Sequence, residues 1–193
     1  MKGNPEATTY QQFRKFIRLI NPKKKDVFYD LGCGYGNPCK WISKYVKLAI
    51  GIEDNELRYR KAVRNTISKR YPNVKIIFGN FRRFKLNDAT IIYSTSFELT
   101  DFIRIKDKVK QGTRIVSIGL PPPYPIKSKG TWPFYICKKP YQKVRNPDEY
   151  AQIYLNDKDA LISNMLEHIT TEDRKYLKNE ISKVKSNWNK LKS

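Results

Sequence analysis

Short apolar runs alternate along the chain with longer stretches in which apolar residues recur every three or four positions. Apolar runs of about four to eight residues, bounded by glycine or polar residues, predict buried strands, and the periodic stretches predict helices with one buried face. The alternation predicts a doubly wound α/β fold with a mostly parallel sheet and a ligand site at the carboxyl ends of the strands. Strands are predicted at residues 26–31, 48–53, 74–78, 89–94, 113–119 and 131–139, and helices at residues 5–20, 38–47, 55–70 and 98–110.

Three segments interrupt this alternation. Residues 79–88 are too few for an ordinary crossover helix, so this connection is predicted to be irregular. The proline-rich residues 120–125 exclude both helix and central strand. Residues 148–169 and 172–191 again have helical spacing, and the apolar seam of the second segment packs either onto the domain or against a partner. The predicted units are an α/β domain at residues 1–140 and a C-terminal helical extension at residues 141–193.

Charge distinguishes this chain from an ordinary α/β domain. Its 193 residues contain 39 Lys and Arg against 18 acids, a net charge of +21, and residues 141–193 account for only +2 of it. Such an excess is expected for a protein with a phosphate-rich partner, with a general enrichment in lysine as the alternative. The three cysteines and His168 lack zinc-ligand spacing, so no metal site is predicted. Without a signal peptide or an apolar run of about 20 residues, we expect a cytoplasmic protein with no membrane partner.

The strongest chemical motif runs from Asp30 to Gly36 (DLGCGYG), between a predicted strand and a predicted helix. Glycines in such a loop let the backbone approach a ligand closely, and an acid at the end of a strand accepts hydrogen bonds or pairs with a cation. The spacing GxGxG differs from the dinucleotide fingerprint GxGxxG, and no Gly-Lys-Ser or Gly-Lys-Thr follows as in a Walker loop. The motif therefore predicts a ligand site of another kind at the end of the first strand.

The motif resembles that of the class I S-adenosylmethionine-dependent methyltransferases, which reads D/E-x-G-x-G-x-G. The resemblance implies their Rossmann-like fold and S-adenosylmethionine as the cofactor. It extends to an acid at the end of the second strand and to a polar and an apolar residue after the third. The implied cofactor contacts are Asp30, Gly32 and Gly34 at the methionine end, Glu53 at the ribose, and Asn80 with Phe81 at the adenine.

A narrower resemblance covers residues 5–139. Residues 6–10 (EATTY) resemble the G-E-T-S-F loop of the non-SET histone lysine methyltransferases, and the compact archaeal protein lysine methyltransferases are similar in size as well. The resemblance implies that Thr8 and Thr9 contact the cofactor. Further segments that resemble this group, in the same order, are residues 79–81 (GNF), 91–97 (IIYSTSF), 111–117 (QGTRIVS) and 134–136 (FYI).

This narrower resemblance also implies a lysine acceptor and a set of catalytic residues. A lysine amine, with a reference pKa of about 10.4, must lose its proton before it attacks a methyl group, and a dry aromatic channel favours the neutral form. Two segments depart from the group: Ala7 replaces an acid, and Thr95-Ser96 replace paired asparagines. These departures leave the identity of the methyl acceptor undetermined. The predicted catalytic residues are Thr95, Phe97 and Tyr135, with Trp132 and Tyr10 as further aromatic candidates.

The sequence supports two alternative functions. An RNA or DNA methyltransferase is favoured by the charge, but the N/D-P-P-Y/F motif expected by resemblance after the fourth strand is replaced by Ser94-Thr95-Ser96-Phe97. A catalytically silent, basic nucleic-acid-binding module is the third possibility. If the protein methylates lysines, its charge repels a basic substrate, and docking on nucleic acid resolves the conflict. The residues predicted to dock on phosphate are Arg14, Lys15, Lys23–Lys25, Arg82 and Arg83.

Overall fold

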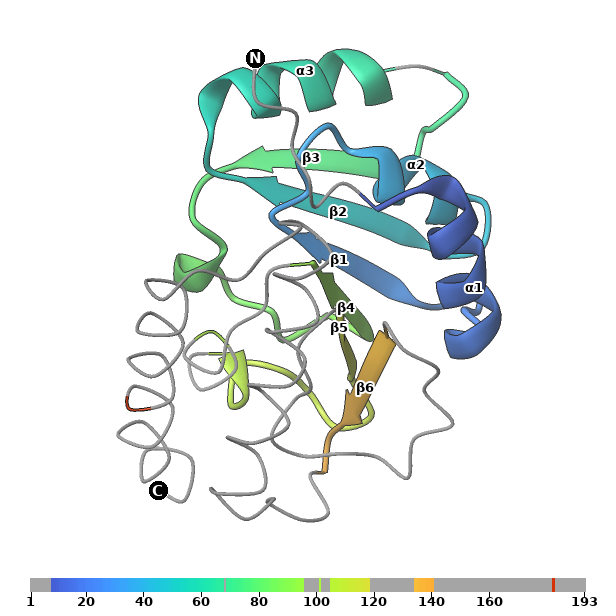
Figure 1. The fold of residues 1–193 in the computed structure, drawn as a ribbon, viewed down its shortest axis with the longest axis vertical. Helices are drawn as coiled ribbons and strands as arrows, with labels where there is room; N and C mark the ends of the chain where they lie inside the picture. Colours follow the sequence, from blue (N-terminus) through green and yellow to red (C-terminus); the bar gives the residue numbers. More distant parts are fainter. Residues whose placement is uncertain are drawn as a thin grey trace, which may run out of the picture.

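Six strands form one sheet in the computed structural model of the chain, in the order β3-β2-β1-β4-β5-β6 (Figure 1). The structure describes residues 8–67, 69–95, 101, 105–118, 134–140 and 182, with the backbone alone at residues 134 and 135. β1 to β5 are parallel, and β6 is antiparallel to β5. This is the predicted doubly wound, mostly parallel α/β class. The strands are β1 (Val27–Leu31), β2 (Leu48–Glu53), β3 (Val74–Phe78), β4 (Ile91–Ser94), β5 (Arg114–Ile118) and β6 (Phe134–Lys138).

The strands end where their apolar runs end. β2 and β3 have the predicted limits, whereas β1 and β4 begin one and two residues later than the pattern predicts. The reason is local: the backbone N–H of Asp26 donates to the Lys23 carbonyl at 2.8 Å, and that of Ala89 donates to the Leu86 carbonyl at 3.1 Å. Both N–H groups are therefore bound in turns and do not extend the ladder.

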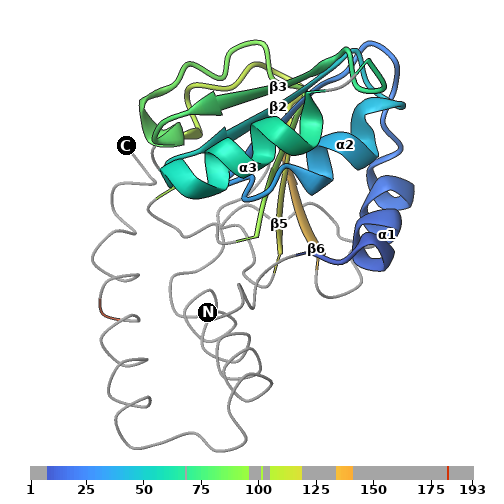
Figure 2. The same ribbon diagram turned by 90° about the horizontal axis from the view of Figure 1, so that it is seen from above.

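Three helices cover one face of the sheet: α1 (Tyr10–Ile20), α2 (Asn37–Ser43) and α3 (Glu56–Thr66) (Figure 2). Thr9 and Gln12 form a capping box at the start of α1, and the Asn55 side chain caps α3. α2 and α3 each end four residues earlier than predicted, because the apolar residues that prolong their pattern belong to the turns that follow. Val46 is buried in the core, and Ile67 is exposed just beyond the C-terminus of α3.

The sheet separates two apolar clusters, as the alternation of side chains along each strand requires. One cluster joins α1 and α2 to the sheet and contains a group of edge-to-face aromatic rings around Phe13 and Tyr93. The other lies on the opposite face and includes Leu31, Ile52 and Ile115. Because both faces are covered, the carboxyl ends of the strands remain as the open edge at which a ligand can bind.

The connections on that opposite face differ in part from the prediction. Residues 79–90 contain one short 3-10 helix, η1 (Phe81–Arg83), in agreement with the predicted irregular connection. Within the helix predicted at residues 98–110, residues 101 and 105 are helical, but the helix ends earlier than predicted: residues 106–108 form a turn, and Val109 forms a parallel bridge to Leu86. The predicted proline segment and helical extension lie outside the described residues, apart from residue 182. No helix in the part of the chain that the structure describes is long and apolar enough to cross a membrane.

Gly51 in the middle of β2 is the position where an added methyl group is expected to cost most. A Cβ there would lie 2.7 Å from Cys33 Sγ and 2.9 Å from Ile76 Cδ1, so the Gly51→Ala variant overpacks the contact between β2 and the glycine loop. We expect its free energy of unfolding to fall by about 1–3 kcal/mol, measured by urea denaturation. The Gly51→Ala/Cys33→Ala double variant should recover part of this loss, and equal stability of Gly51→Ala and the wild type would contradict the packing argument.

Candidate functional site

The loop between β1 and α2 leaves open space where its first two glycines lie. Gly32 and Gly34 have φ angles of +82° and +55°, in the left-handed region that glycine adopts without strain, and no atom lies within 4 Å of where their Cβ atoms would be. A Cβ at Gly36 would instead lie 3.2 Å from Thr66 on α3. The first two glycines therefore allow a ligand to approach the backbone, whereas the third permits close packing of the loop.

Glu53 ends β2 as a buried carboxylate surrounded by donors. Its Oε2 accepts a hydrogen bond from the Gly34 N–H at 2.8 Å. Its Oε1 accepts from the Asn55 N–H at 3.0 Å and from Arg58 Nε at 3.0 Å, with Arg58 Nη2 at 2.8 Å. Three of these four donors face Oε1, and one faces Oε2. A ligand hydroxyl can therefore donate to the remaining acceptor position of Oε2, whereas Oε1 accepts from a ligand only if Arg58 moves aside.

Asp30 ends β1 and is also buried, but it lacks such partners. Its neighbours in register are Gly51 on β2 and Tyr93 on β4. Among the described residues, the hydrogen-bonding group recorded at its carboxyl is the Cys39 thiol, with Sγ 4.0 Å from Oδ2. Burial, together with the negative charge of Glu53, raises the pKa of Asp30 to about 8. Asp30 is therefore a buried acid whose ionised form is stabilised once a cationic group is placed beside it.

Tyr93 and Thr8 close the site above Asp30. Tyr93 is fully buried, and its hydroxyl lies 2.5 Å from that of Thr8, in the segment that leads into α1. Burial raises the pKa of Tyr93, so the phenol stays neutral. The same effect raises the pKa of Cys33 and Cys39, which are therefore protonated thiols and weak nucleophiles.

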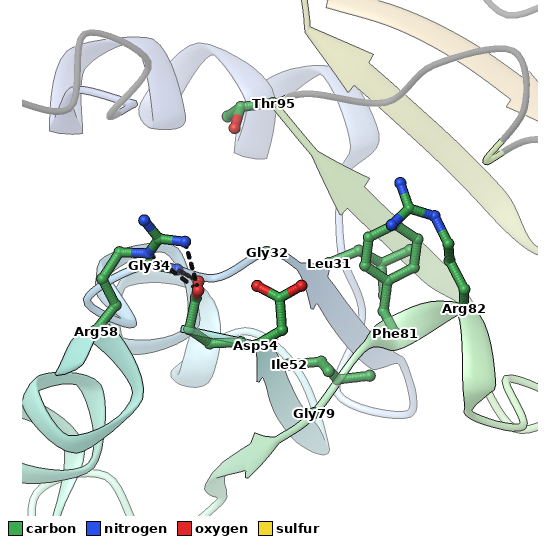
Figure 3. A pocket seen from close by; sticks show the side chains of 11 residues that line it. Leu31, Gly32, Gly34, Ile52, Asp54, Arg58, Gly79, Phe81, Arg82 and Thr95 are labelled. Carbon is green, nitrogen blue, oxygen red and sulfur yellow. Dashed lines mark hydrogen bonds and ion pairs between the residues drawn. The ribbon is translucent and has the colours of Figure 1, made fainter. Parts of the chain in front are cut away.

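Two cavities meet at the glycine loop. The larger, of about 290 Å³, has Arg58 on one side, Phe81 with Arg82 on the other, and Thr95 facing them (Figure 3). The Arg82 guanidinium lies 4.9 Å from the centre of the Phe81 ring and 2.5 Å from the buried carboxylate of Asp101. The smaller cavity, of about 70 Å³, contains Asp30. Residues that line both cavities are Gly32, Gly34, Arg58 and Thr95.

The structure brings most of the sequence-predicted site residues to these cavities. Thr9 and Asn80 do not line them, because Thr9 caps α1 and the Asn80 side chain accepts from the Arg82 N–H at 3.0 Å. The exposed Tyr10 packs edge-on against Trp41. Phe97, Trp132 and the side chain of Tyr135 lie outside the described residues. The predicted residues that line a cavity are Thr8, Asp30, Gly32, Gly34, Glu53, Phe81 and Thr95.

Sequence reasoning missed three side chains of the site and assigned another elsewhere. Arg58 lies one helical turn after the Asn55 cap, and its basic character alone does not reveal its ion pair with Glu53. Tyr93 lies within the predicted strand at residues 89–94 and Asp54 directly follows the one at residues 48–53, but no pattern marks either side chain as part of the site. Arg82, predicted to dock on phosphate, instead lines the larger cavity. Contacts between elements distant in sequence, which the sequence does not encode locally, bring Tyr93, Arg58 and Arg82 to the site.

These residues fit a ligand with three distinct parts. Glu53 suits a pair of hydroxyl groups, the poorly partnered Asp30 suits a cationic amine, and the Phe81 ring suits a flat apolar group. The open backbone at Gly32 and Gly34 gives room for a chain that connects them. No group of His, Cys, Asp and Glu within the described ranges is placed to hold a metal ion.

Comparison with known proteins gives one clear relative and many structural neighbours. No family model matches the chain. A protein-lysine N-methyltransferase of Saccharolobus islandicus is 32% identical over 112 residues, which cover 54% of this chain and 68% of the relative. An RNA methyltransferase of Salinibacter ruber, solved with S-adenosyl-L-homocysteine, superposes with a TM-score of 0.62 at 18% identity, over 72% of this chain and 97% of its own. A precorrin 8w decarboxylase of Methanobacterium thermoautotrophicum has a TM-score of 0.51 at 27% identity, over 58% and 64% of the two chains.

Proposed function

The chain belongs to the class I S-adenosylmethionine-dependent methyltransferases, and from this membership we propose that it methylates lysine side chains of proteins. Its cofactor is accordingly S-adenosylmethionine. The observation that carries the lysine proposal is the 32% identity to the archaeal protein-lysine N-methyltransferase. The proposal also agrees with the N-terminal loop and the strand segments that resemble the lysine methyltransferases.

We assign the parts of the cofactor by the chemistry of the cavity walls. Asp30 and the backbone at Gly32 and Gly34 hold the methionine end, with Thr8 closing the smaller cavity beside them. Glu53 accepts a hydrogen bond from one ribose hydroxyl at Oε2 and from the other at Oε1 after Arg58 moves off it, and Phe81 packs against the adenine. Thr9 and Asn80, by resemblance also cofactor residues, act on this assignment through the caps of α1 and η1.

Methyl transfer depends mainly on the alignment of the acceptor amine with the methyl group and on the exclusion of water. When bound, the cofactor supplies a methyl group on a sulfonium, and the C–N bond to the acceptor forms as the C–S bond breaks. The chain's own residues fix the two reactants in line and exclude water from them. Thr95, at the end of β4, borders both cavities. We propose that it lines the path of the acceptor amine, which loses its proton to solvent before attack, with Phe97 and Tyr135 as the aromatic wall.

An RNA or DNA methyltransferase is the alternative, and the net charge of +21 favours it. Nucleic acid then becomes the methyl acceptor. The Salinibacter ruber neighbour does not decide the question, since at 18% identity it establishes the common fold alone.

Transfer of labelled methyl groups into a cell extract distinguishes the candidates. We expect protease to release the label as methyl-lysine, with no label from the Asp30→Ala variant and normal labelling by Asp107→Asn, whose side chain is 79% exposed and lines neither cavity. Release of the label by nuclease would overturn the lysine proposal in favour of the alternative. Full S-adenosyl-L-homocysteine binding by the wild type, without labelling of any macromolecule, would favour a catalytically silent module.

A further inference from the structure

The layer of helices that covers one face of the sheet carries many more basic than acidic residues. α1 contributes three Lys or Arg, α2 one and α3 four, and the single acid on the three helices is Glu56. Glu56 is already paired with Arg60 at 2.6 Å. We call the solvent side of α1, α2 and α3, with the turns that follow α1 and α2, the helical face (Figure 2).

The two turns extend the helical face without interruption. Lys24 Nζ donates a hydrogen bond to the Lys44 carbonyl at 2.7 Å, which joins the turn after α1 to the end of α2. The exposed Lys and Arg residues of the described segment 8–67 are Arg14, Lys15, Arg18, Lys23, Lys24, Lys25, Lys44, Lys47, Arg60, Lys61 and Arg64.

The acids of the same segment do not offset this charge. Asp26 is buried and paired with Arg114 at 2.8 Å, and Asp30 and Glu53 are buried at the cofactor site. The exposed acids among residues 8–67 are Asp54, which lines the larger cavity, and the already paired Glu56. Among the described residues, the helical face therefore presents many exposed cations and one exposed acid, Glu56, which is already paired.

Of the residues that the sequence predicted to bind phosphate, Arg14, Lys15 and Lys23–Lys25 belong to the helical face. Arg82 does not, because it is held by Asp101 at the larger cavity, and the exposed Arg83 beside it lies on η1, outside the helical face. The structure thus distinguishes basic residues on the helical face from Arg82 at the cofactor site, a distinction that the sequence does not make. It also adds the basic residues of α3 to the helical face.

We infer that the helical face is a docking surface for the phosphate backbone of duplex nucleic acid. Exposed guanidinium and ammonium groups on an outer helical layer suit contacts with the phosphates of a duplex, which bind without regard to sequence. Bases of a single strand stack on free aromatic rings. On the helical face the ring of Tyr35 is covered by Lys61 Nζ at 4.2 Å, and the exposed Tyr10 packs edge-on against Trp41.

A membrane surface fits the helical face less well. Binding to lipid requires apolar side chains beside the charges, and the apolar side of α1, with Phe13 and Phe16, is buried in the core. Two exposed apolar residues, Leu57 and Ile67, lie at opposite ends of α3 and form no patch.

Docking on a duplex has a consequence that rests on the proposed function. A basic enzyme meets a basic protein more readily when both are bound to the same polyanion, because the phosphates screen their mutual repulsion. The surface itself does not depend on the transfer reaction, so it can be tested without methylation.

The test compares two triple variants of equal net charge. In the face variant, Arg14, Lys44 and Arg64 are replaced by Gln, and in the control variant, Lys85, Lys110 and Lys138, all exposed and outside the helical face, are replaced by Gln. Fluorescence anisotropy with a short DNA duplex of random sequence gives the affinity between about 50 and 200 mM salt. We expect wild-type affinity to fall by about 10³-fold across this range, and the slope of log affinity on log salt to shrink by about 2 to 3 in the face variant alone.

Equal losses in both variants would show that net charge alone acts and would overturn the docking surface. A flat salt dependence of the wild type, or tighter binding to phosphatidylserine vesicles than to duplex, would overturn it as well. Acetylation of wild-type lysines, read by mass spectrometry, provides a check free of folding effects: the duplex should protect Lys23–Lys25 and Lys44 but not Lys85. Affinity for S-adenosyl-L-homocysteine should be unchanged in both variants, which separates failure of this surface from failure of the proposed function.

Discussion

The Glu53→Gln variant is expected to bind S-adenosyl-L-homocysteine about 100-fold more weakly than the wild type. Both oxygens of the Glu53 carboxylate face N–H groups, Oε2 that of Gly34 and Oε1 those of Asn55 and Arg58. An amide at this position turns one NH₂ group toward a donor and removes the charge that strengthens the bonds to the ribose. Hydrogen bonds to a charged group contribute roughly 1.5–3 kcal/mol each, so loss of about 3 kcal/mol corresponds to the expected factor. Isothermal titration calorimetry measures it directly.

Two further variants separate binding from folding. Asp54→Asn changes the adjacent, exposed carboxylate that lines the same cavity, and its affinity should fall by less than about fivefold. The Glu53→Gln/Arg58→Met double variant removes the cation that Glu53→Gln leaves unpaired, so it should recover stability in urea without recovering binding. Recovery of binding together with stability would show that Glu53 supports the loop and does not contact the ribose.

The same residues show how far the sequence predicts the site. Asp30 and Glu53 are recognisable because each closes a short apolar run, and parallel strands bring such ends to one edge of a sheet. The limits of β2 and β3 are predicted for the same reason. The Arg58 ion pair and the hydrogen bond between Thr8 and Tyr93 are not predictable, since each depends on how a side chain packs across elements distant in sequence.

The helices show the complementary weakness of sequence patterns. Val46 continues the apolar spacing of α2 but is buried in the turn after it, and Ile67 continues the spacing of α3 but is exposed. Periodicity records which positions are apolar and does not record where the backbone leaves the helix. Helix ends are therefore determined here by turns and tertiary packing.

The cofactor affinity of the wild type is expected to rise with pH up to about pH 8, by at most about tenfold per pH unit, and the Asp30→Asn variant should lose this dependence. Burial and the charge of Glu53 raise the pKa of Asp30 to about 8, so its carboxyl is protonated at neutral pH in the free protein. An ion pair with the amine of the methionine end requires the carboxylate, so binding releases a proton. Calorimetric titration of S-adenosyl-L-homocysteine in buffers of different ionisation enthalpy counts the released protons.

The same group gives stability the opposite pH dependence in the free protein. Between its ordinary value of 3.8 and about 8, Asp30 is protonated in the folded state and ionised in the unfolded state, so the folded state holds more protons. The free energy of unfolding contributed by Asp30 is therefore greatest below about pH 4 and is lost as pH rises toward 8. Urea denaturation should show this slope in the wild type and in the control Asp107→Asn, and a shallower slope in Asp30→Asn. If proton release and both slopes persist in Asp30→Asn, another group titrates on binding, and Asp30 is not the partner of the cofactor amine.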